Sequence, residues 1–351
     1  MFTLSRATDE EFDAYARSQP TGNFHQTTQM ANFRRALGWD VHPLLLKKDA
    51  QVVAALLLAG KAGRYEVTMG PVADFSNEAV TKELLTQLIK YAKAIGGHTV
   101  EVYPFSVYQT RLSNGIVESG PIEKVINSFK AEGWKHKGFT THYDPVANRW
   151  AFVKDLSGLK NDQELLASYR QTTRQTINKL VKDDYSIKKL GYDELEVAKK
   201  LIDSSYDRNE VHKRDLNYYQ QLFTHFGDDI QFLVVYHKGV TPISTGVFIK
   251  HPNELVYFAS GADTEYRHLY GGHFLQHSVM GRAINDGVTR YNFYGVSGQF
   301  EKNPLLVYKS GFRGYIEEYV GGFTFIANPG KHLVRRALRA PKAAARKMLG
   351  K

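Results

Sequence analysis

One order of predicted elements occurs twice along this chain, and this repetition limits the folds open to it more than any other feature. In each half, three strands form a meander, a helix flanked by glycine follows, and a further strand comes after the helix. Turn residues between apolar runs predict the strands, and apolar residues at helical spacing predict the helices. The order indicates α/β architecture with mixed sheets flanked by helices, built as two copies of one fold. The predicted elements are Val41–Lys47, Gln51–Leu58, Tyr65–Thr68, Ser76–Ile95 and His98–Tyr103 in the first half, and Ile230–His237, Ile243–Lys250, Leu255–Ser260, Gly271–Asp286 and Tyr291–Tyr294 in the second.

The size of the chain fits two domains followed by a basic tail. Its 351 residues, 42% of them apolar, are enough for two packed cores. We predict a first domain at 1–150 and a second at 151–330. The tail, 331–351, carries eight Lys/Arg and no acid, and so holds most of the formal net charge of +10. A basic tail favours an anionic partner such as membrane lipid or RNA, although a solubilising role fits the same composition.

Several classes of site are excluded by composition. The chain has no cysteine, and therefore no disulfide, thiolate metal site or thiol nucleophile. His273 and His277 are four apart, but Phe274 stands where a zinc protease has glutamate, so we expect no metal site. The N-terminus has acids where a signal peptide needs an apolar core, and the longest apolar run, near Val52–Ala59, is too short to span a bilayer. We expect a cytoplasmic protein, with the tail available for peripheral contact with the inner face of the membrane.

The stretch from Arg290 to Val320 contains the strongest candidate for chemistry. A predicted strand is followed by a Gly/Ser loop, Gly295–Gly298, and then by a second apolar run that ends in Tyr308-Lys309. A lysine at the end of an apolar run can be held rigidly where a negative charge develops. The alternative is a strand-edge lysine in water, which is a common position for lysine.

Two sequence blocks in this stretch carry a resemblance to a known family. YNFYGVSGQF, followed by VYKSGF and IEEYVGGF, is similar to the C-terminal signature of the Fem-type peptidoglycan branching aminoacyltransferases. The resemblance implies two tandem acetyltransferase-like (GNAT) domains. It also implies transfer of Ala, Ser or Gly from aminoacyl-tRNA to the stem-peptide amine of lipid II or UDP-MurNAc-pentapeptide, without a cofactor. Many members carry a helical arm between two meander strands. Here Tyr236–Val240 turns straight into Pro242–Ile249, which indicates the armless type.

The resemblance assigns the catalytic pair. Lys309 matches the family lysine proposed to stabilise the oxyanion of the tetrahedral intermediate, and Tyr308 matches an aromatic neighbour that lines the same channel. Arg214 and Tyr218 match a pair that binds the phosphate region of the acceptor, and a guanidinium suits a diphosphate because it donates two parallel hydrogen bonds. The alternative for Arg214 is an exposed ion pair with Asp207 or Asp215.

Other assignments come from departures from the family pattern. Tyr257, expected on the same strand face as Ala259, is predicted to replace a phosphate-contacting tyrosine. Arg34 or Arg35 is predicted to replace a family lysine. Tyr103 occupies a substrate-site position where the family often has aspartate, and it cannot accept a proton at neutral pH because the pKa of a phenol is near 10.

Two other functions remain open at this point. One is an acetyl-coenzyme A-dependent N-acyltransferase on the same fold, and the other is a non-enzymatic protein that binds RNA or membrane through the basic tail. The basic helix predicted at Thr172–Lys182 is compatible with contact to phosphate and equally with a solvated face.

Overall fold

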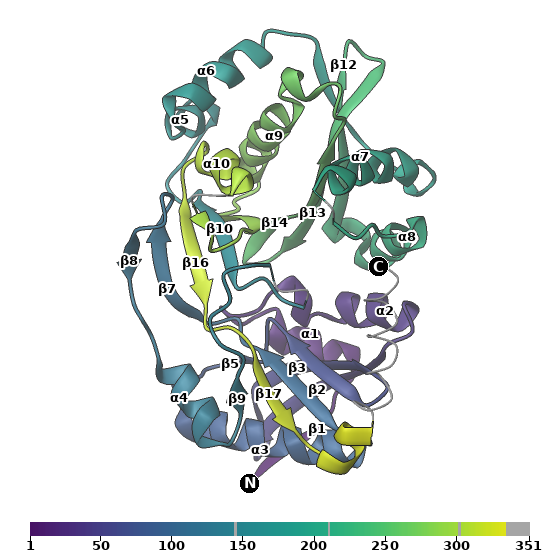
Figure 1. Cartoon of the computed structure of the whole chain (residues 1–351), viewed down its shortest axis with the longest axis vertical. Helices are drawn as coiled ribbons and strands as arrows, with labels where there is room; N and C mark the ends of the chain where they lie inside the picture. Colours follow the sequence, from purple (N-terminus) through teal and green to yellow (C-terminus); the bar gives the residue numbers. More distant parts are fainter. Residues whose placement is uncertain (144–145, 210, 301–302, 335–351) are drawn as a thin grey trace.

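The protein is built around two mixed sheets with helices on their faces (Figure 1). The computed structural model describes residues 1–143, 146–209, 211–300 and 303–334. The predicted fold class is therefore confirmed. Most of the predicted tail, 335–351, lies outside the described residues.

The first sheet has eight strands in the order β1-β2-β3-β4-β6-β17-β9, with β5 paired to β3. The helices around it include α3, which begins after Asn77, whose side chain accepts a hydrogen bond from the Val80 amide. Elements of this unit are β1 (Phe2–Arg6), α1 (Asp9–Ala16), η1 (Phe24–Gln26), α2 (Thr28–Ala36), β2 (Asp40–Lys48), β3 (Gln51–Lys61), β4 (Arg64–Thr68), β5 (Val72–Ala73), α3 (Glu78–Ala94), β6 (Thr99–Tyr103), α4 (Lys124–Ala131), β9 (Lys135–His136) and β17 (Phe323–Ile326).

The second sheet has nine strands in the order β11-β12-β13-β14-β15-β10-β16-β7-β8. Its elements are β7 (Val107–Leu112), β8 (Val117–Ser119), β10 (Trp150–Asp155), α5 (Asp162–Ala167), α6 (Gln171–Leu180), β11 (Tyr185–Lys189), η2 (Tyr192–Glu194), α7 (Leu195–Arg208), α8 (Leu216–Phe226), η3 (Gly227–Asp229), β12 (Ile230–His237), β13 (Thr241–His251), β14 (Glu254–Ala262), η4 (Arg267–Leu269), α9 (Gly271–Asn285), β15 (Arg290–Gly295), α10 (Pro304–Ser310) and β16 (Tyr315–Tyr319).

The predicted division near residue 150 does not separate the two sheets. β7 and β8 come from the first part of the chain but pair with β16 in the second sheet. β17 comes from the end of the second part and pairs with β6 and β9 in the first sheet. Each sheet is thus completed by strands from the other half, which fixes the two units against each other.

The segment before Lys309, which the sequence analysis describes only as an apolar run, is helical. Residues Pro304–Ser310 form the helix α10. Its start is set by Asn303, whose Oδ1 accepts hydrogen bonds from the amides of Leu305 and Leu306, with Pro304 at the first helical turn. Lys309 therefore lies in the last turn of a helix rather than on a strand.

The parallel strand pair differs between the two units. β4 and β6 stay paired over five positions, from Arg64 with Thr99 to Thr68 with Tyr103. β14 and β15 pair at only two positions, Leu255 with Tyr291 and Val256 with Asn292. Beyond these positions the strands separate, and β15 continues beside β10.

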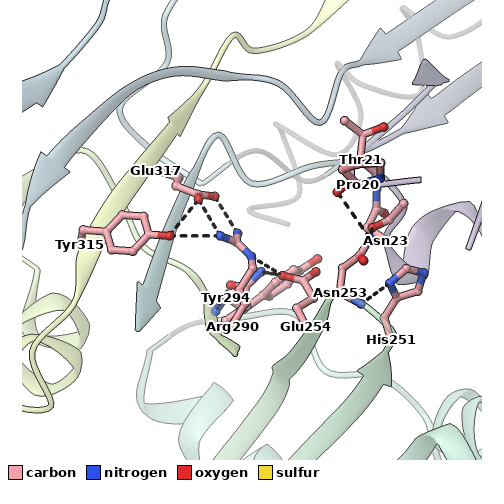
Figure 2. Close-up of polar contacts among 12 residues, drawn as sticks. Pro20, Thr21, Asn23, His251, Asn253, Glu254, Arg290, Tyr294, Tyr315 and Glu317 are labelled. Atoms are coloured by element: carbon pink, nitrogen blue, oxygen red, sulfur yellow. Dashed lines mark hydrogen bonds and ion pairs between the residues drawn. The ribbon is translucent and has the colours of Figure 1, made fainter. Parts of the chain in front are cut away.

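A buried polar network holds the paired end of β14 and β15. Glu254 accepts hydrogen bonds from Arg290 Nε at 3.0 Å and from Asn292 Nδ2 at 2.9 Å. Arg290 also forms a two-pronged ion pair with Glu317 of β16, with both N–O distances 2.7 Å (Figure 2). The neighbouring Asn253 donates to the carbonyls of Gln19 and Gly22, so the same end is tied to the first unit.

Candidate active site

Lys309 is buried without a counter-ion. The residue is 3% exposed, and its Nζ donates to the carbonyl oxygens of Gly295 at 2.7 Å and Tyr294 at 3.4 Å. Among the described residues, no carboxylate lies within ion-pair distance of it. Burial lowers the pKa of Lys309 to about 7. The solvated strand-edge alternative is wrong, because the ammonium is enclosed and held at the open end of the β14–β15 pair.

The backbone at Tyr294 shapes this cradle. Tyr294 has φ 63°, a left-handed conformation that a tyrosine rarely adopts. Its amide donates to Asn292 Oδ1 at 2.8 Å, which fixes the turn. In a regular strand, successive carbonyls point to opposite sides, so the turn at Tyr294 allows both carbonyls to reach one ammonium. The sequence analysis did not select Tyr294 as a site residue, since nothing in its side chain signals a left-handed backbone.

The Tyr294 side chain connects this cradle to the first unit. Its hydroxyl lies 3.1 Å from Nε2 of His25 in η1, and its ring contacts Phe24 and Phe258. Burial raises its pKa, and the charges of Tyr218 and Arg34 act on it as well. The side chain retains some exposure while Phe293 and Gly295 on either side are buried. Tyr294 therefore stands between Lys309 and the residues predicted to bind the acceptor.

Tyr308, the other member of the predicted catalytic pair, faces α9. Its hydroxyl donates to the carbonyl of Gly272 at 3.0 Å, and its ring meets His273 and Phe312 edge-on. Burial raises its pKa well above the usual range, so it stays neutral. Tyr308 thus anchors α10 to the start of α9, and its contact with substrate stays a prediction.

Arg214 and Tyr218 lie together, as predicted. The guanidinium of Arg214 is 5.1 Å from the centre of the Tyr218 ring. The ion-pair alternative does not hold in the described residues, because Asp207 pairs with Lys213 at 2.6 Å and Asp215 caps α8 by accepting from the Tyr218 amide at 2.9 Å. Arg214 is exposed and has no carboxylate partner there.

Arg34 lies near this pair, whereas Arg35 does not share its surroundings. The ring of Tyr218 meets Phe33 of α2 edge-on at 5.2 Å. Arg34, the next residue, pairs with Glu66 at 3.2 Å and donates to Thr68 Oγ1 at 2.9 Å. Arg35 is exposed and donates to Asn32. Of the two arginines, Arg34 is the one directed toward the interior, and its charge is already balanced.

Tyr257 and Tyr103 occupy other surroundings. The expected shared face of Tyr257 and Ala259 is wrong, because a β-bulge in β14 places Val247 opposite Ala259 and Phe248 opposite Tyr257. Tyr257 stacks on Phe248 in the core of the second unit, while Ala259 packs in a different core cluster.

Tyr103 lies at the end of the closed β4–β6 pair. Its hydroxyl donates to Glu101 Oε2 at 3.2 Å and accepts a hydrogen bond from Lys137 Nζ. It packs in a small apolar cluster that includes Met69 and Tyr319. The substrate contact predicted for Tyr103 stays a prediction.

Two open hollows occur on the described surface, with volumes of about 610 and 640 Å³. The first is lined by residues of the first unit and Lys331, and the second by α7 and Thr264. Neither is lined by Lys309, Arg214 or Tyr218. Within the described residues, no group of three or more His, Asp or Glu side chains is arranged to hold a metal ion, and no helix is long and apolar enough to cross a bilayer.

The geometry can now be set beside known proteins. A sequence profile of the FemAB family matches residues 7–238 and 236–339, which together span nearly all of the chain. The chain belongs to the FemAB family. The two matched segments meet at the short β12–β13 turn, the place where the sequence analysis found no helical arm, and the FemAB match therefore fits the armless type.

Relatives with assigned activity support the class of enzyme. The chain is 24% identical to aminoacyltransferase FemA of Staphylococcus epidermidis over 415 aligned residues, which cover 97% of this chain and 99% of the relative. The identity and both shares are the same for aminoacyltransferase FemA of Staphylococcus aureus. Because 415 exceeds the 351 residues of this chain, the alignment contains gaps where FemA has additional residues. Within the FemAB family this protein is an aminoacyltransferase.

Solved structures support the tandem fold. The crystal structure of FemX superposes with a TM-score of 0.81 at 18% identity, covering 95% of this chain and 99% of FemX. A tandem GNAT protein from the clavulanic acid biosynthesis pathway superposes with a TM-score of 0.58 at 13% identity, covering 94% and 99%. The predicted architecture of two GNAT-like units is confirmed.

Proposed function

We propose that this FemAB protein transfers an amino acid from aminoacyl-tRNA to the stem-peptide amine of a peptidoglycan precursor, and so builds part of an interpeptide bridge. The donor amino acid is Ala, Ser or Gly, and the acceptor is lipid II or UDP-MurNAc-pentapeptide. The observation that carries the proposal is the enclosed ammonium of Lys309, which has two carbonyl acceptors and no carboxylate among the described residues. A third hydrogen of the ammonium is left for a substrate oxygen.

The chemistry needs little more than position and charge. The acceptor amine attacks the ester carbonyl, a C–N bond forms, and the C–O bond to the tRNA ribose breaks. The amine loses one proton and the ribose oxygen gains one. The ester is already activated, so we propose no metal or coenzyme. Lys309 stabilises the oxyanion that develops between these steps, and an ammonium in a water-poor site is more effective than one in water.

The acceptor is proposed to enter from the α8 side. Arg214 is exposed, has no carboxylate partner in the described residues and is stacked on Tyr218, so its hydrogen-bond donors are available to a phosphate. Tyr294 is near enough to Tyr218 for the two to interact electrostatically, and its carbonyl accepts a hydrogen bond from Lys309. We also propose a cytoplasmic location, where both substrates are made, with peripheral membrane contact through 331–351.

A transfer assay tests the proposal directly. Purified protein is given tRNA charged with radiolabelled Ala, Ser or Gly, crossed with lipid II and UDP-MurNAc-pentapeptide, and acetyl-coenzyme A is offered to the same acceptors in parallel. We expect label on an acceptor peptide from one charged tRNA. Acetylation by acetyl-coenzyme A with no transfer from any charged tRNA would contradict the proposal and support the alternative N-acyltransferase.

A further inference from the structure

The face formed by α6 and the turn after α10 differs in charge from the other helical surfaces of the second unit. Buried residues Thr173, Ile177 and Leu180 attach α6 to the core. The rest of the helix and its flanks carry four basic residues and no acid between residues 170 and 182. Arg313, in the turn after α10, is exposed and adds a fifth cation. The basic residues of this face are Arg170, Arg174, Lys179, Lys182 and Arg313.

The α7 helix of the same unit shows a different pattern. Its lysines are paired with carboxylates four residues away, Lys199 with Asp203 and Lys200 with Glu196. None of the five basic residues of the α6 face has a carboxylate within 4 Å among the described residues. Asp183 ends the basic run and faces His237 Nε2 at 3.5 Å instead. A solvated surface normally mixes both signs, whereas an unpaired cluster of one sign suits a polyanion.

The α6 face is attached directly to the helix that carries Lys309. The Arg170 amide donates to the Gly311 carbonyl at 2.9 Å, and Gly311 lies so close to Thr173 that an added Cβ would meet Thr173 Oγ1 at 2.4 Å. Lys154 Nζ reinforces the same turn by donating to the Phe312 carbonyl at 2.9 Å. The basic face and Lys309 therefore belong to one rigid block.

The position of α6 also separates it from the proposed acceptor side. In Figure 1, α5 and α6 lie on one side of α9 and α10, and α7 and α8 lie on the other. Arg214 lies just before the N-cap of α8, and Tyr218 lies in its first turn. A polyanion bound to α6 would thus approach from the opposite side to the proposed acceptor site, which leaves room for both substrates.

We infer that the α6 face binds the sugar–phosphate backbone of the donor tRNA next to its aminoacylated end. This inference rests on the proposed function. Lys and Arg side chains bind RNA phosphates largely without regard to sequence, and each neutralised phosphate releases counter-ions. The α6 face thereby gives a protein without the helical arm a second contact with the RNA, in addition to the reacting ester.

A matched pair of triple variants tests this surface. Arg174→Gln, Lys179→Gln and Lys182→Gln are combined in one full-length protein. The control combines Lys82→Gln, Lys90→Gln and Lys93→Gln, three exposed lysines of α3 without ion pairs among the described residues. Both variants lose three positive charges, so a change in net charge alone affects them equally. The readouts are KM for aminoacyl-tRNA, KM for the acceptor, and the salt dependence of tRNA binding.

We expect the α6 variant to raise KM for aminoacyl-tRNA by about tenfold and to reduce the slope of log K against log salt by ~2 to 3, about one per lost phosphate contact. KM for the acceptor should stay unchanged. The loss in kcat/KM should be larger for full-length tRNA than for a short donor that keeps only the aminoacylated CCA end. The ratio of kcat/KM for these two donors should therefore be lower in the α6 variant than in the unsubstituted protein. The control should keep the salt slope of the unsubstituted protein.

The outcomes separate the two proposals. No transfer by the unsubstituted protein would contradict the proposed function and with it this surface. Transfer by the unsubstituted protein with the same KM and salt slope in both triple variants would contradict the surface alone. Loss of binding to vesicles of phosphatidylglycerol and phosphatidylcholine, with tRNA binding intact, would likewise contradict it by showing a membrane contact.

Discussion

The two units of this protein use the same parallel strand pair in opposite ways. In the first unit, β4 and β6 stay hydrogen-bonded to the end, and Tyr103 at that end is closed in by Lys137 and Glu101. In the second unit, β14 and β15 separate after two pairs, and the carbonyls of Tyr294 and Gly295 are freed to hold Lys309. A duplicated fold can thus keep one copy closed for stability and open the other for chemistry.

This difference in strand separation has a physical cause, which lies at the opposite end of each strand pair. The open pair is held by the buried network of Glu254, Arg290 and Glu317 (Figure 2). At the Arg64 end of the closed pair, Arg64 pairs with Glu101, and the Arg64 side chain is 46% exposed. A strand pair with few backbone hydrogen bonds needs strong side-chain interactions at the positions where it remains paired.

Arg290→Leu should have the largest effect, since it removes the one cation between two buried carboxylates. Leaving buried carboxylates unpaired costs about 3–5 kcal/mol, so we expect the free energy of unfolding in urea to fall by that amount. Arg64→Leu, the matched change at the closed pair, should cost less than about 1 kcal/mol because a partly exposed pair contributes little. If both variants lost the same free energy of unfolding, the network around Arg290 would not stabilise the open strand pair more than the Arg64–Glu101 ion pair stabilises the closed one.

Lys309→Met tests where the chemistry lies. Removing one fixed oxyanion donor typically costs about 100-fold or more in kcat, and we expect this loss with KM for both substrates changed little. Lys137→Met removes a lysine beside the closed pair and should change kcat by less than about threefold, because that lysine is bound to Tyr103 and Glu101. Single-turnover transfer by purified, folded variants is the measurement. A comparable loss of kcat in Lys137→Met would contradict the proposal that the reaction takes place at the open strand pair.

The pH dependence of stability should reveal the buried lysine. The pKa of Lys309 is lowered to about 7 by burial, whereas an unfolded lysine has a pKa near 10.4. Between these values the unfolded chain binds more protons, so this group makes the free energy of unfolding rise with pH, by up to ~1.4 kcal/mol per pH unit. The rise should be absent in Lys309→Met. Urea unfolding of both proteins between pH 6 and 10 measures it, and parallel curves for the two would contradict the buried, destabilised ammonium.

Local sequence patterns predicted the elements but not the features that make the site. The helix expected at Ser76–Ile95 is observed at Glu78–Ala94, because apolar spacing and an Asn cap are local signals. The exchange of β7 and β17 between sheets depends on long-range pairing, which leaves no local pattern. The α10 helix was not predicted, although Asn303-Pro304 is a helix-start signal. Lys309 was a candidate from its position at the end of an apolar run, and the family resemblance then assigned roles to Lys309 and Arg214.

Tyr294→Phe should give the smallest effect. It separates the role of the Tyr294 side chain from that of its backbone carbonyl. The change removes the hydroxyl that meets His25 Nε2 at 3.1 Å but leaves the backbone carbonyl that holds Lys309. One hydrogen bond contributes about 0.5–1.5 kcal/mol, so the free energy of unfolding should fall by that amount while kcat changes less than about threefold. A double-mutant cycle with His25→Leu should return a coupling of the same size, because phenylalanine keeps the ring that stacks on His25 and loses only the hydrogen bond. A loss in kcat approaching that of Lys309→Met would instead mean that the hydroxyl itself contacts the reacting substrates, and the open pair would then contribute a second side chain to the chemistry.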